Sequence, residues 1–577
     1  MSGGGSDRPV RIANVSGFYG DRLQAAAEML AGPDPIDVMT GDYLAELTML
    51  ILWKARQKDP SAGYATTFVR QLEQVMGTCL ERGIKIVANA GGLNPRGCAL
   101  RIAEVASTLG LSPKVAVVDG DDVTALFDGV VTANAYLGGM GIAAGLAAGA
   151  DIVVTGRVTD AALVVGAAAW WHRWTDADLD QLAAAVVAGH IIECGPQATG
   201  GNYSFIDELP DDRYPGFPIA EIAADGTTVI TKQTGSGGMV TTGTVTAQLL
   251  YEIETPAYAN PDVVARFDTI LLEQSGPDRV TISGVRGDPP PTRLKVALNS
   301  VGGWRNSMTM VLTGLDVEAK AARATAMLAE TLGGFDRFAE HHIELVRSDH
   351  DDAVTNATAT AQLRITVKDP DRTKVDRRFS GAVTELLLAS YAGAFTTTPP
   401  SSATEFGVYR PAYVDAASVT HRVLMPDGRE TVVALPGAVA DFVAPAGDDG
   451  TPADADALAE WGQTQRRPLG LVCGARSGDK GGNANVGLWA RTDEAFRWLD
   501  IFMDVRRFRM LVPEAAELQV RRYRLANLRA LNFVVVGILG DGVASSVRFD
   551  AQAKGLGEYL RSRLVDVPLL LTRPEGR

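Results

Sequence analysis

The chain has 577 residues, of which 46% are hydrophobic and 21% charged, and its formal net charge is −15 at pH 7. This length exceeds what one hydrophobic core supports, so we expect about two to four domains. The acidic excess argues against nucleic acid and anionic membrane surfaces as partners, because both attract clustered positive charge.

The cysteines and the N-terminus predict a cytoplasmic protein. The four cysteines lie far apart and include no CxxC pair, which excludes a disulfide scaffold: Cys79, Cys98, Cys194 and Cys473. The opening MSGGGSDRPV lacks the apolar stretch of a signal peptide. The most apolar stretch, from Met140 to Trp171, contains Asp151, Arg157 and Asp160. It therefore predicts a buried helix–strand–helix rather than a membrane span.

The first 195 residues alternate short β-branched runs with longer amphipathic segments. The runs are VRIANV (10–15), IDVM (36–39), IKIVAN (84–89), KVAVVD (114–119) and DIVVTG (151–156). Apolar strands separated by helices are typical of a parallel sheet that is covered on both faces. We therefore predict an α/β domain over residues 1–195, with a mostly parallel sheet and helices on both of its faces.

The rest of the chain changes character twice. Residues 196–444 mix strand-like runs with two expected helices, Val317–Leu332 and Gly381–Tyr391, and predict an α+β domain packed on the first. Residues 445–467 are rich in Pro, Gly and acidic residues and have the composition of a linker. Residues 468–577 predict a compact α+β domain with a βαββαβ-like succession, in which VASSVRFD (543–550) is one strand.

Each of the five N-terminal strands runs into a polar turn that carries Gly, Asp or Asn. In open parallel sheets, ligands bind beyond the carboxyl ends of the strands, so these turns predict one site. Asp42, Glu46 and Asp160 are candidate acid/base residues. The candidate substrate-binding residues from the same turns are Ser16, Gly17, Gly20, Asp21, Arg22, Asn89, Gly91, Asn94 and Arg157. Turn and capping chemistry alone accounts for any one of these residues taken singly.

Phosphate-binding fingerprints are absent from these loops. Gly17 and Gly20 do not form G-x-G-x-x-G, and no G-x-x-x-x-G-K-[ST] loop occurs. Backbone N–H groups at a strand–Gly–helix junction can still bind phosphate, which leaves a ligand such as coenzyme A open.

Three further segments carry candidate site residues. The Gly-rich segment 190–202 offers Glu193 as an acid/base and Cys194, which more often serves as a small buried apolar residue than as a nucleophile. Lys232 precedes a Gly-rich loop and can pair with a carboxylate or phosphate, or simply be solvated. The segment 476–487 contributes Asp479, Lys480 and Asn485 to substrate binding. Seven arginines make the last domain locally basic: Arg506, Arg507, Arg509, Arg521, Arg522, Arg524 and Arg529. They can bind coenzyme A phosphates or dock the domain on the acidic main body, and docking is slightly favoured.

We expect no metal site. The histidines lack ligand spacing, and His341 and His342 are adjacent. The DGDD run at 119–122 can hold Mg²⁺ through its carboxylates, but acids that cap a helix explain it about as well.

Several long motifs resemble one known family. SGFYGDR, TGDYLAE, NAGGLNP, TGRVTDAAL, HIIECGPQATGGNY, GGMVTTGTVTAQLLYEI and ARSGDKGGNANVG follow in the order of the acyclic terpene utilisation proteins of the AtuA type. The resemblance extends from about Val10 to Pro568, and the tail resembles the ferredoxin-like module that ends many members. It implies a role in bacterial breakdown of citronellol and geraniol, and a branched acyl-CoA or its carboxylated derivative as the substrate class.

The leading hypothesis is an acyl-CoA-processing enzyme, a hydro-lyase or carbon–carbon lyase that uses acid/base catalysis. Coenzyme A then enters as part of the substrate, with no tightly bound cofactor, and a homo-oligomer is expected. The alternative is a non-catalytic assembly or scaffold subunit for acyl-CoA carboxylase machinery. Oxidation by a nicotinamide cofactor is disfavoured, because the glycine fingerprint is missing.

Overall fold

The computed structural model describes residues 8–450, 458 and 460–572, except for the side chain of Glu46. These residues divide into two compact units. The first comprises Met1–Asn299, Tyr409–Val543 and Asp550–Arg577, and the second comprises Ser300–Val408 and Ala544–Phe549. The boundaries of these two units differ from the domain boundaries predicted at 195/196 and 444/445. The reason is that strands from the middle region join the N-terminal sheet.

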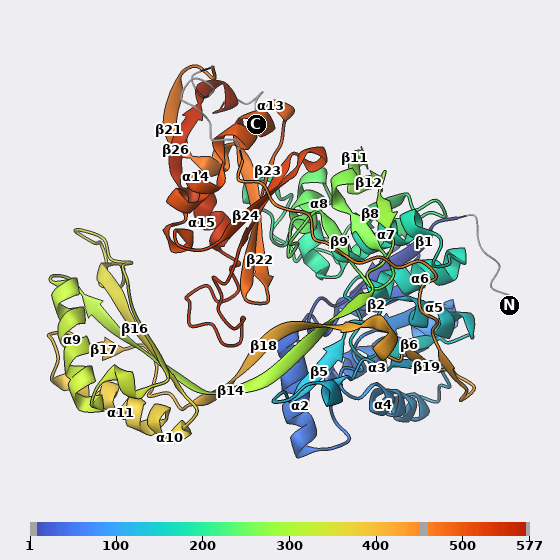
Figure 1. The fold of residues 1–577 in the computed structure, drawn as a ribbon, viewed down its shortest axis with the longest axis horizontal. Helices are drawn as coiled ribbons and strands as arrows, with labels where there is room; N and C mark the ends of the chain where they lie inside the picture. Colours follow the sequence, from blue (N-terminus) through green and yellow to red (C-terminus); the bar gives the residue numbers. More distant parts are fainter. Residues whose placement is uncertain (1–7, 451–457, 459, 573–577) are drawn as a thin grey trace. The chain divides into compact units, whose positions relative to one another are not determined.

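The five expected N-terminal strands form the parallel centre of a large mixed sheet in the first unit (Figure 1). Their order is β1-β2-β3-β6-β4. Their bounds are Val10–Asn14 (β1), Val38–Gly41 (β2), Lys85–Ala88 (β3), Val115–Asp119 (β4) and Ile152–Thr155 (β6). The prediction of a parallel sheet in this region is confirmed.

Antiparallel strands extend this sheet at both edges. On the β1 side follow β7, β8, β12 and β11, and on the β4 side β19 and β20. Their bounds are Pro218–Ile222 (β7), Thr228–Lys232 (β8), Leu271–Gly276 (β11), Arg279–Ser283 (β12), Arg422–Leu424 (β19) and Glu430–Val432 (β20). Smaller strands of the unit are Thr132–Ala135 (β5), Ala257–Ala259 (β9), Val264–Arg266 (β10) and Arg286–Asp288 (β13).

Alternate residues of the central strands enter hydrophobic clusters on opposite faces of the sheet. Ile12 and Val153 pack in one cluster with α5, α6 and α7, whereas Ala13 and Val154 pack in another with α1, α3 and α4. Both faces are thus covered by helices, as the apolar runs predict. The helices are Ala25–Ala31 (α1), Glu46–Lys58 (α2), Thr66–Arg82 (α3), Pro95–Thr108 (α4), Met140–Ala147 (α5), Ala162–His172 (α6), Leu179–Ile192 (α7) and Thr242–Leu249 (α8).

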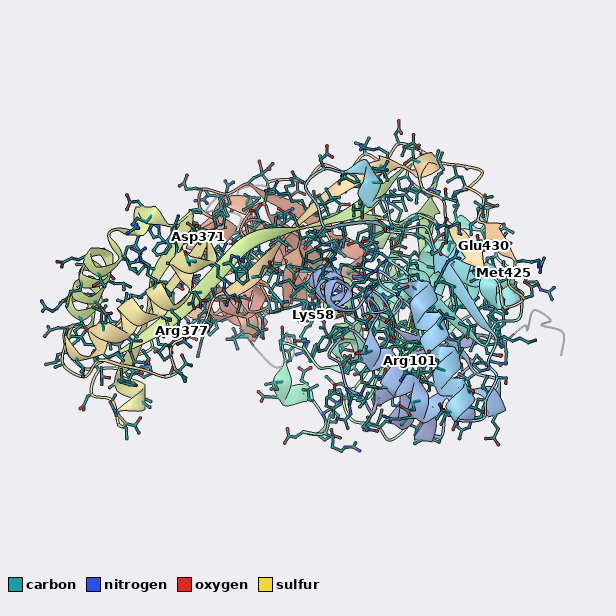
Figure 2. The ribbon with its side chains drawn as sticks, turned by 90° about the horizontal axis from the view of Figure 1, so that it is seen from below. Lys58, Arg101, Asp371, Arg377, Met425 and Glu430 are labelled. Carbon is teal, nitrogen blue, oxygen red and sulfur yellow. The ribbon has the colours of Figure 1, made fainter. Side chains whose placement is uncertain are left out.

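Charged side chains lie on the outer faces of these helices. Lys58 at the end of α2 and Arg101 on α4 are exposed (Figure 2). The helix–strand–helix expected between Met140 and Trp171 is confirmed as α5, β6 and α6. No helix in the described part of the chain is long and apolar enough to cross a membrane.

The second unit packs helices on an antiparallel sheet. The chain enters this unit within β14 and leaves it within β18. Strand and helix bounds are Arg293–Thr313 (β14), Glu340–Val346 (β15), Thr360–Asp369 (β16), Phe395–Thr396 (β17), Thr404–Asp415 (β18), Val317–Leu332 (α9), Arg372–Val375 (α10) and Arg377–Glu385 (α11). The helix predicted at Val317–Leu332 is confirmed, whereas the one predicted at Gly381–Tyr391 starts earlier, at Arg377, and ends at Glu385.

The C-terminal region has its own hydrophobic core beneath a four-stranded antiparallel sheet, ordered β22-β23-β25-β24. Its elements are Thr464–Pro468 (β21), Cys473–Lys480 (β22), Asn483–Ala490 (β23), Asp493–Phe502 (α13), Val505–Leu511 (α14), Val520–Leu525 (β24), Ala530–Val535 (β25), Leu556–Ser562 (α15) and Leu564–Pro568 (β26). The expected ligand loop at 476–487 is a β-hairpin, since Gly481 adopts a positive φ of 62° and turns the chain. No strand forms at 543–550.

Neutral polar side chains carry much of the docking of this C-terminal region within the first unit. Asn485 donates to the carbonyl of Leu250 at 2.6 Å and accepts from the amide of Glu252 at 2.9 Å. Asn532 donates to the carbonyl of Ile253 at 3.1 Å. The expectation that the arginine cluster docks the domain is wrong for its most buried member, since Arg522 pairs with Asp500 and Asp448 of the same region. These two acids lie beside its own strand and satisfy the guanidinium locally.

The predicted linker is only partly described. Residues 451–457 and 459 lie outside the described part of the chain. Before them, Asp448 pairs with Arg522 of β24 through both backbone and side chain, so this part of the segment is attached to the C-terminal region.

Candidate functional site

A large cavity of the first unit opens beyond the carboxyl ends of the central strands. Its volume is about 1430 Å³, which exceeds the range typical of pockets for drug-sized ligands. Gly17, Gly20 and Asp21 line it from the loop after β1, and Asp42 lines it from the loop after β2. The position agrees with the rule that ligands bind at this edge of a parallel sheet.

Three carboxylates from distant segments meet in this cavity. Asp42 follows β2, Asp160 follows β6, and Glu193 follows the last residue of α7. One oxygen atom of each lies within 4.8 Å of an oxygen of the other two. Because like charges so close together repel, such a cluster is stable only when protons or a cation neutralise part of its charge.

Asp42 is held in place by two hydrogen bonds to one oxygen. Its Oδ1 accepts from Nδ2 of Asn89 at 2.7 Å and from the amide of Leu44 at 2.9 Å. Ser16 supports the same loop by donating its hydroxyl to the carbonyl of Asp42 at 3.0 Å. Burial and the neighbouring Asp160 raise the pKa of Asp42 well above its ordinary value, so this carboxyl takes up a proton readily.

Arg157 connects Asp160 to the Asp42 loop. Its Nη2 lies 3.0 Å from Oδ1 of Asp160, and its Nη1 donates to the carbonyl of Leu44 at 2.7 Å. The guanidinium also stacks on the ring of Tyr136, 4.4 Å from the ring centroid. Of the three clustered carboxylates, Asp160 is therefore the one that forms an ion pair with Arg157.

Glu193 is buried beside His190 and Cys194. Burial, followed by the charges of Asp160 and Glu252, raises the pKa of Glu193 well above its ordinary value. Its Oε1 lies 3.5 Å from Nδ1 of His190, whose pKa burial lowers to about 4. Burial and the Glu193 charge raise the pKa of Cys194 as well, which keeps this thiol protonated and disfavours it as a nucleophile.

The C-terminal region supplies part of the cavity wall. Asp479 and Lys480 from the β22–β23 hairpin and Lys554 line the cavity. Lys554 forms a hydrogen bond with the hydroxyl of Tyr251 and lies 3.7 Å from Glu252. The predicted binding residues Asp479 and Lys480 are thus brought to the same cavity as the carboxylates, whereas Asn485 lies in the docking interface.

Besides Ser16, Lys232 and Asn485, four predicted residues do not line the cavity. Arg22 pairs with Glu28 at 2.5 Å, and Asn94 caps α4 by accepting from Gly97. Asn89 donates to Asp42 and accepts from the amide of Tyr43. A Cβ on Gly91 would lie 2.5 Å from the carbonyl oxygen of Thr155, so this glycine allows two loops to approach closely. The side chain of Glu46 lies outside the described residues.

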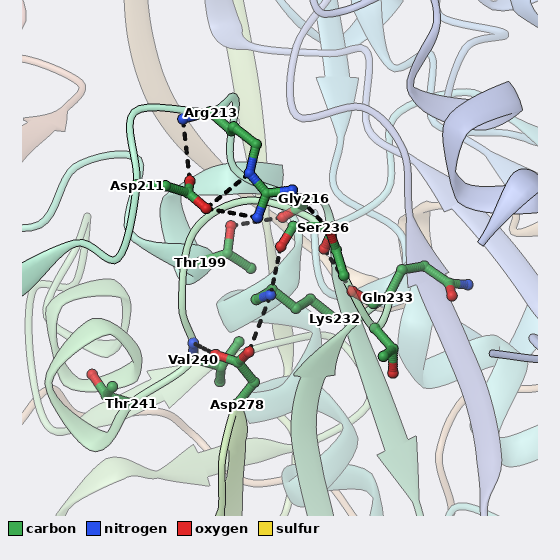
Figure 3. A network of polar contacts seen from close by, with 12 residues as sticks. Thr199, Asp211, Arg213, Gly216, Lys232, Gln233, Ser236, Val240, Thr241 and Asp278 are labelled. Carbon is green, nitrogen blue, oxygen red and sulfur yellow. Dashed lines mark hydrogen bonds and ion pairs between the residues drawn. The ribbon is translucent and has the colours of Figure 1, made fainter. Parts of the chain in front are cut away.

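Lys232 belongs to a separate polar network (Figure 3). Its Nζ donates to the carbonyl of Ser236 at 2.9 Å and lies 3.1 Å from Oδ2 of Asp278. Asp278 in turn accepts from the amide of Val240 at 2.8 Å. The lysine thereby ties two loops together, and in this position its ammonium has a carboxylate partner.

The DGDD run does not gather its carboxylates around one point. Asp119 pairs with Arg96 and Arg422, both at 2.8 Å. Asp121 accepts from Asn134 and from the amide of Arg157, and Asp122 caps the turn at Thr124. Structural pairing and capping therefore account for these acids.

Several cavity residues were missed by the sequence reasoning. Tyr251, Glu252 and Lys554 lie in segments that do not follow a strand, and Tyr136 follows β5, which was not among the five predicted strands. Glu252 has a positive φ of 54°, a strained backbone for a residue other than glycine, which often marks functional loops. The motif GGMVTTGTVTAQLLYEI, which ends with Tyr-Glu-Ile at 251–253, is the sequence feature that could have identified Tyr251 and Glu252.

Fold and site together define an α/β protein with a carboxylate-rich cavity, completed by a ferredoxin-like domain. The family model "Acyclic terpene utilisation family protein AtuA" matches residues 10–425, and "AtuA ferredoxin-like domain" matches residues 467–566. The chain belongs to this family, which implies a role in acyclic terpene utilisation. No curated protein and no solved structure matches the chain.

Proposed function

We propose that this chain is an enzyme that processes a branched or carboxylated acyl-CoA by acid/base catalysis, as a hydro-lyase or carbon–carbon lyase. The observation that carries the proposal is the meeting of Asp42, Asp160 and Glu193 within 4.8 Å in a cavity of about 1430 Å³. A cavity of this size suits a long ligand, and the family role in acyclic terpene utilisation supports a branched acyl chain.

Both reaction types need one group that donates a proton to a developing oxyanion and one that accepts a proton from carbon or oxygen. Glu193 and Asp42 suit the donor role, because burial raises the pKa of each carboxyl. Asp160 suits the acceptor role, because Arg157 pairs with it and favours a charged partner. Protons then pass between neighbouring carboxyl oxygens without leaving the cavity.

Cationic side chains on the cavity wall support an anionic substrate. Arg293 and Lys295 of β14 line the cavity together with Lys480 and Lys554 of the C-terminal region. Lysine and arginine bind carboxylates and phosphates through charge-assisted hydrogen bonds. In this proposal the ferredoxin-like domain contributes to substrate binding, and coenzyme A enters as part of the substrate.

The first experiment compares thermal unfolding of the protein with and without coenzyme A and a panel of short and branched acyl-CoAs. A ligand at a hundredfold excess over its dissociation constant adds about 2.7 kcal/mol to the folded state. We expect a rise in midpoint with a branched acyl-CoA, followed by turnover of that thioester. No rise with any member of the panel contradicts the proposal and favours the scaffold alternative.

Variants then separate binding from chemistry. Glu193→Gln keeps the shape of the side chain but can no longer transfer a proton, so we expect acyl-CoA binding with turnover reduced by at least 100-fold, the order of general acid catalysis. Glu104→Gln on the exposed face of α4 is the matched control and should turn over like the unchanged protein. Full turnover by Glu193→Gln would remove this residue from the mechanism.

A further inference from the structure

We propose that Asp42, Asp160 and Glu193 form a binding site for one divalent cation of the Mg²⁺, Mn²⁺ or Ca²⁺ class. This inference goes beyond the proposed function and holds whether or not the substrate is an acyl-CoA. It departs from the expectation of no metal site, which was drawn from histidine spacing. All three ligands are carboxylates, and they come from segments that only the fold brings together.

The separation of the oxygen atoms fits a single ion. The three carboxylate oxygens lie within 4.8 Å of one another. An ion bound about 2.4 Å from each of three evenly spaced oxygens requires them to lie about 4.2 Å apart, and one bound at about 2.1 Å requires about 3.6 Å. Ca²⁺ therefore fits after small rotations of the carboxyl groups, and Mg²⁺ or Mn²⁺ fits after larger ones.

The carboxyl of Glu193 has a buried oxygen atom without a hydrogen-bond partner in the described part of the chain, and a buried histidine lies beside it. Glu193 is only 9% exposed, and its Oε2 has no hydrogen-bond partner among the described residues. His190 beside it is 1% exposed and interacts with the backbone of Leu249. Its Nδ1 faces Oε1 of Glu193 at 3.5 Å. A buried oxygen atom without a partner is costly unless a ligand satisfies it.

The ring of His190 also packs against aromatic side chains. It contacts Tyr258 and Phe267, with ring centroids 5.4 and 5.5 Å away. From this position it can orient the Glu193 carboxyl, as outer-shell partners orient metal ligands in other proteins. Asn89 and the amide of Leu44 occupy Oδ1 of Asp42 and leave Oδ2 for the ion.

The formal charges also favour a divalent ion. Three carboxylates face the one guanidinium of Arg157, which leaves two negative charges to neutralise. Carboxylate oxygens without thiolate or imidazole ligands select hard cations. With an ion bound, Asp42 and Glu193 would be ionised, and the ion rather than a protonated carboxyl would polarise a substrate carbonyl.

The test is direct binding of Mn²⁺ to the full chain after treatment with EDTA, with free Mn²⁺ measured by electron paramagnetic resonance and no acyl-CoA present. We expect one Mn²⁺ per chain, displaced by Mg²⁺ or Ca²⁺. Glu193→Gln and Asp160→Asn should each weaken Mn²⁺ binding at least tenfold. Asp122→Asn, which changes an exposed acid of the DGDD run, is the matched control and should bind Mn²⁺ like the unchanged protein.

A second measurement shows that the variants fold. Mn²⁺ should raise the thermal midpoint of the unchanged protein and of Asp122→Asn, but not that of Glu193→Gln or Asp160→Asn. Without Mn²⁺, the midpoints of these two cluster variants should be at least as high as that of the unchanged protein. Failure of the unchanged protein to bind Mn²⁺ at millimolar concentration overturns the inference. Equal Mn²⁺ binding by both cluster variants does the same, since the ion then lies elsewhere. Acyl-CoA binding in EDTA is measured separately, so the proposed function can fail independently.

Discussion

Nη2 of Arg157 lies 3.0 Å from Oδ1 of Asp160, while Nη1 of the same guanidinium donates to the carbonyl of Leu44 at 2.7 Å. Leu44 in turn donates its amide to Asp42. One buried arginine therefore sets the position of two of the three clustered carboxylates. The fork of the guanidinium makes this possible, because its nitrogens point to both partners at once.

Arg157→Gln should destabilise the protein by about 2 kcal/mol, because Asp160 and the Leu44 carbonyl both lose a charged donor. Urea unfolding at pH 7 measures the change. Arg101→Gln, at an exposed arginine paired with Glu104, is the matched control and should leave the unfolding free energy nearly unchanged. Equal effects of the two substitutions would contradict the connecting role of Arg157.

Gly17→Ala should damage the cavity. An added Cβ would lie 2.8 Å from the carbonyl carbon of Cys194, so the loop after β1 and the segment after α7 would have to separate. We expect a loss of about 1–3 kcal/mol in unfolding free energy and weaker ligand binding. Gly77→Ala in α3 meets nothing closer than 3.8 Å and should stabilise the helix by about 1 kcal/mol. A stable Gly17→Ala with normal binding would show that the loops can move apart freely.

Asp262 should make stability depend on pH. Burial raises the pKa of Asp262 to about 6, although its carboxyl accepts from the amide of Gly139 at 2.7 Å. The folded state therefore holds the proton more tightly than the unfolded state. The contribution of Asp262 to stability is complete below about pH 4 and is lost as the pH rises through about 6.

The measurement compares the unchanged protein with Asp262→Asn by urea unfolding at pH 4.5 and pH 7. The stability of the unchanged protein relative to the variant should be about 2 kcal/mol higher at pH 4.5 than at pH 7. Between pH 7 and pH 8 the difference should be constant, which serves as the internal control. A difference that does not vary between pH 4.5 and pH 7 would show that the carboxyl stays ionised in the folded state.

Asn485→Ala should loosen the docking of the C-terminal region. The amide of Asn485 donates to Leu250 and Asn532 and accepts from Glu252, and it is fully buried. Removing it leaves buried partners unsatisfied, at a cost of about 2–3 kcal/mol. Hydrogen exchange should accelerate at the amide of Glu252. Asn356→Ala, at an exposed position, should alter neither stability nor exchange at Glu252.

The local pattern of the chain was sufficient for the central sheet and for several helices. The runs at 10–15, 84–89 and 151–156 are continuous and β-branched, and such segments form buried parallel strands almost wherever they occur. The same reasoning predicts the edge of the sheet at which Asp42 and Asp160 lie. It did not identify the segment 476–487 as a β-hairpin, because the pairing of β22 with β23 is not visible in the local pattern, although Asp479 and Lys480 of this hairpin line the cavity.

What the sequence by itself determined is the α/β class, the parallel strands and the strand-end loops that carry polar residues, because these depend on periodicity and on residues close in the chain. Only the tertiary structure decided that Glu193, at the end of a helix, meets Asp42 and Asp160 within 4.8 Å, and that Lys480 and Lys554 reach the same cavity. It also decided that Lys232 lies in another network. The physical reason is that such contacts join residues far apart in the sequence, and their geometry follows from how whole elements pack rather than from any local preference.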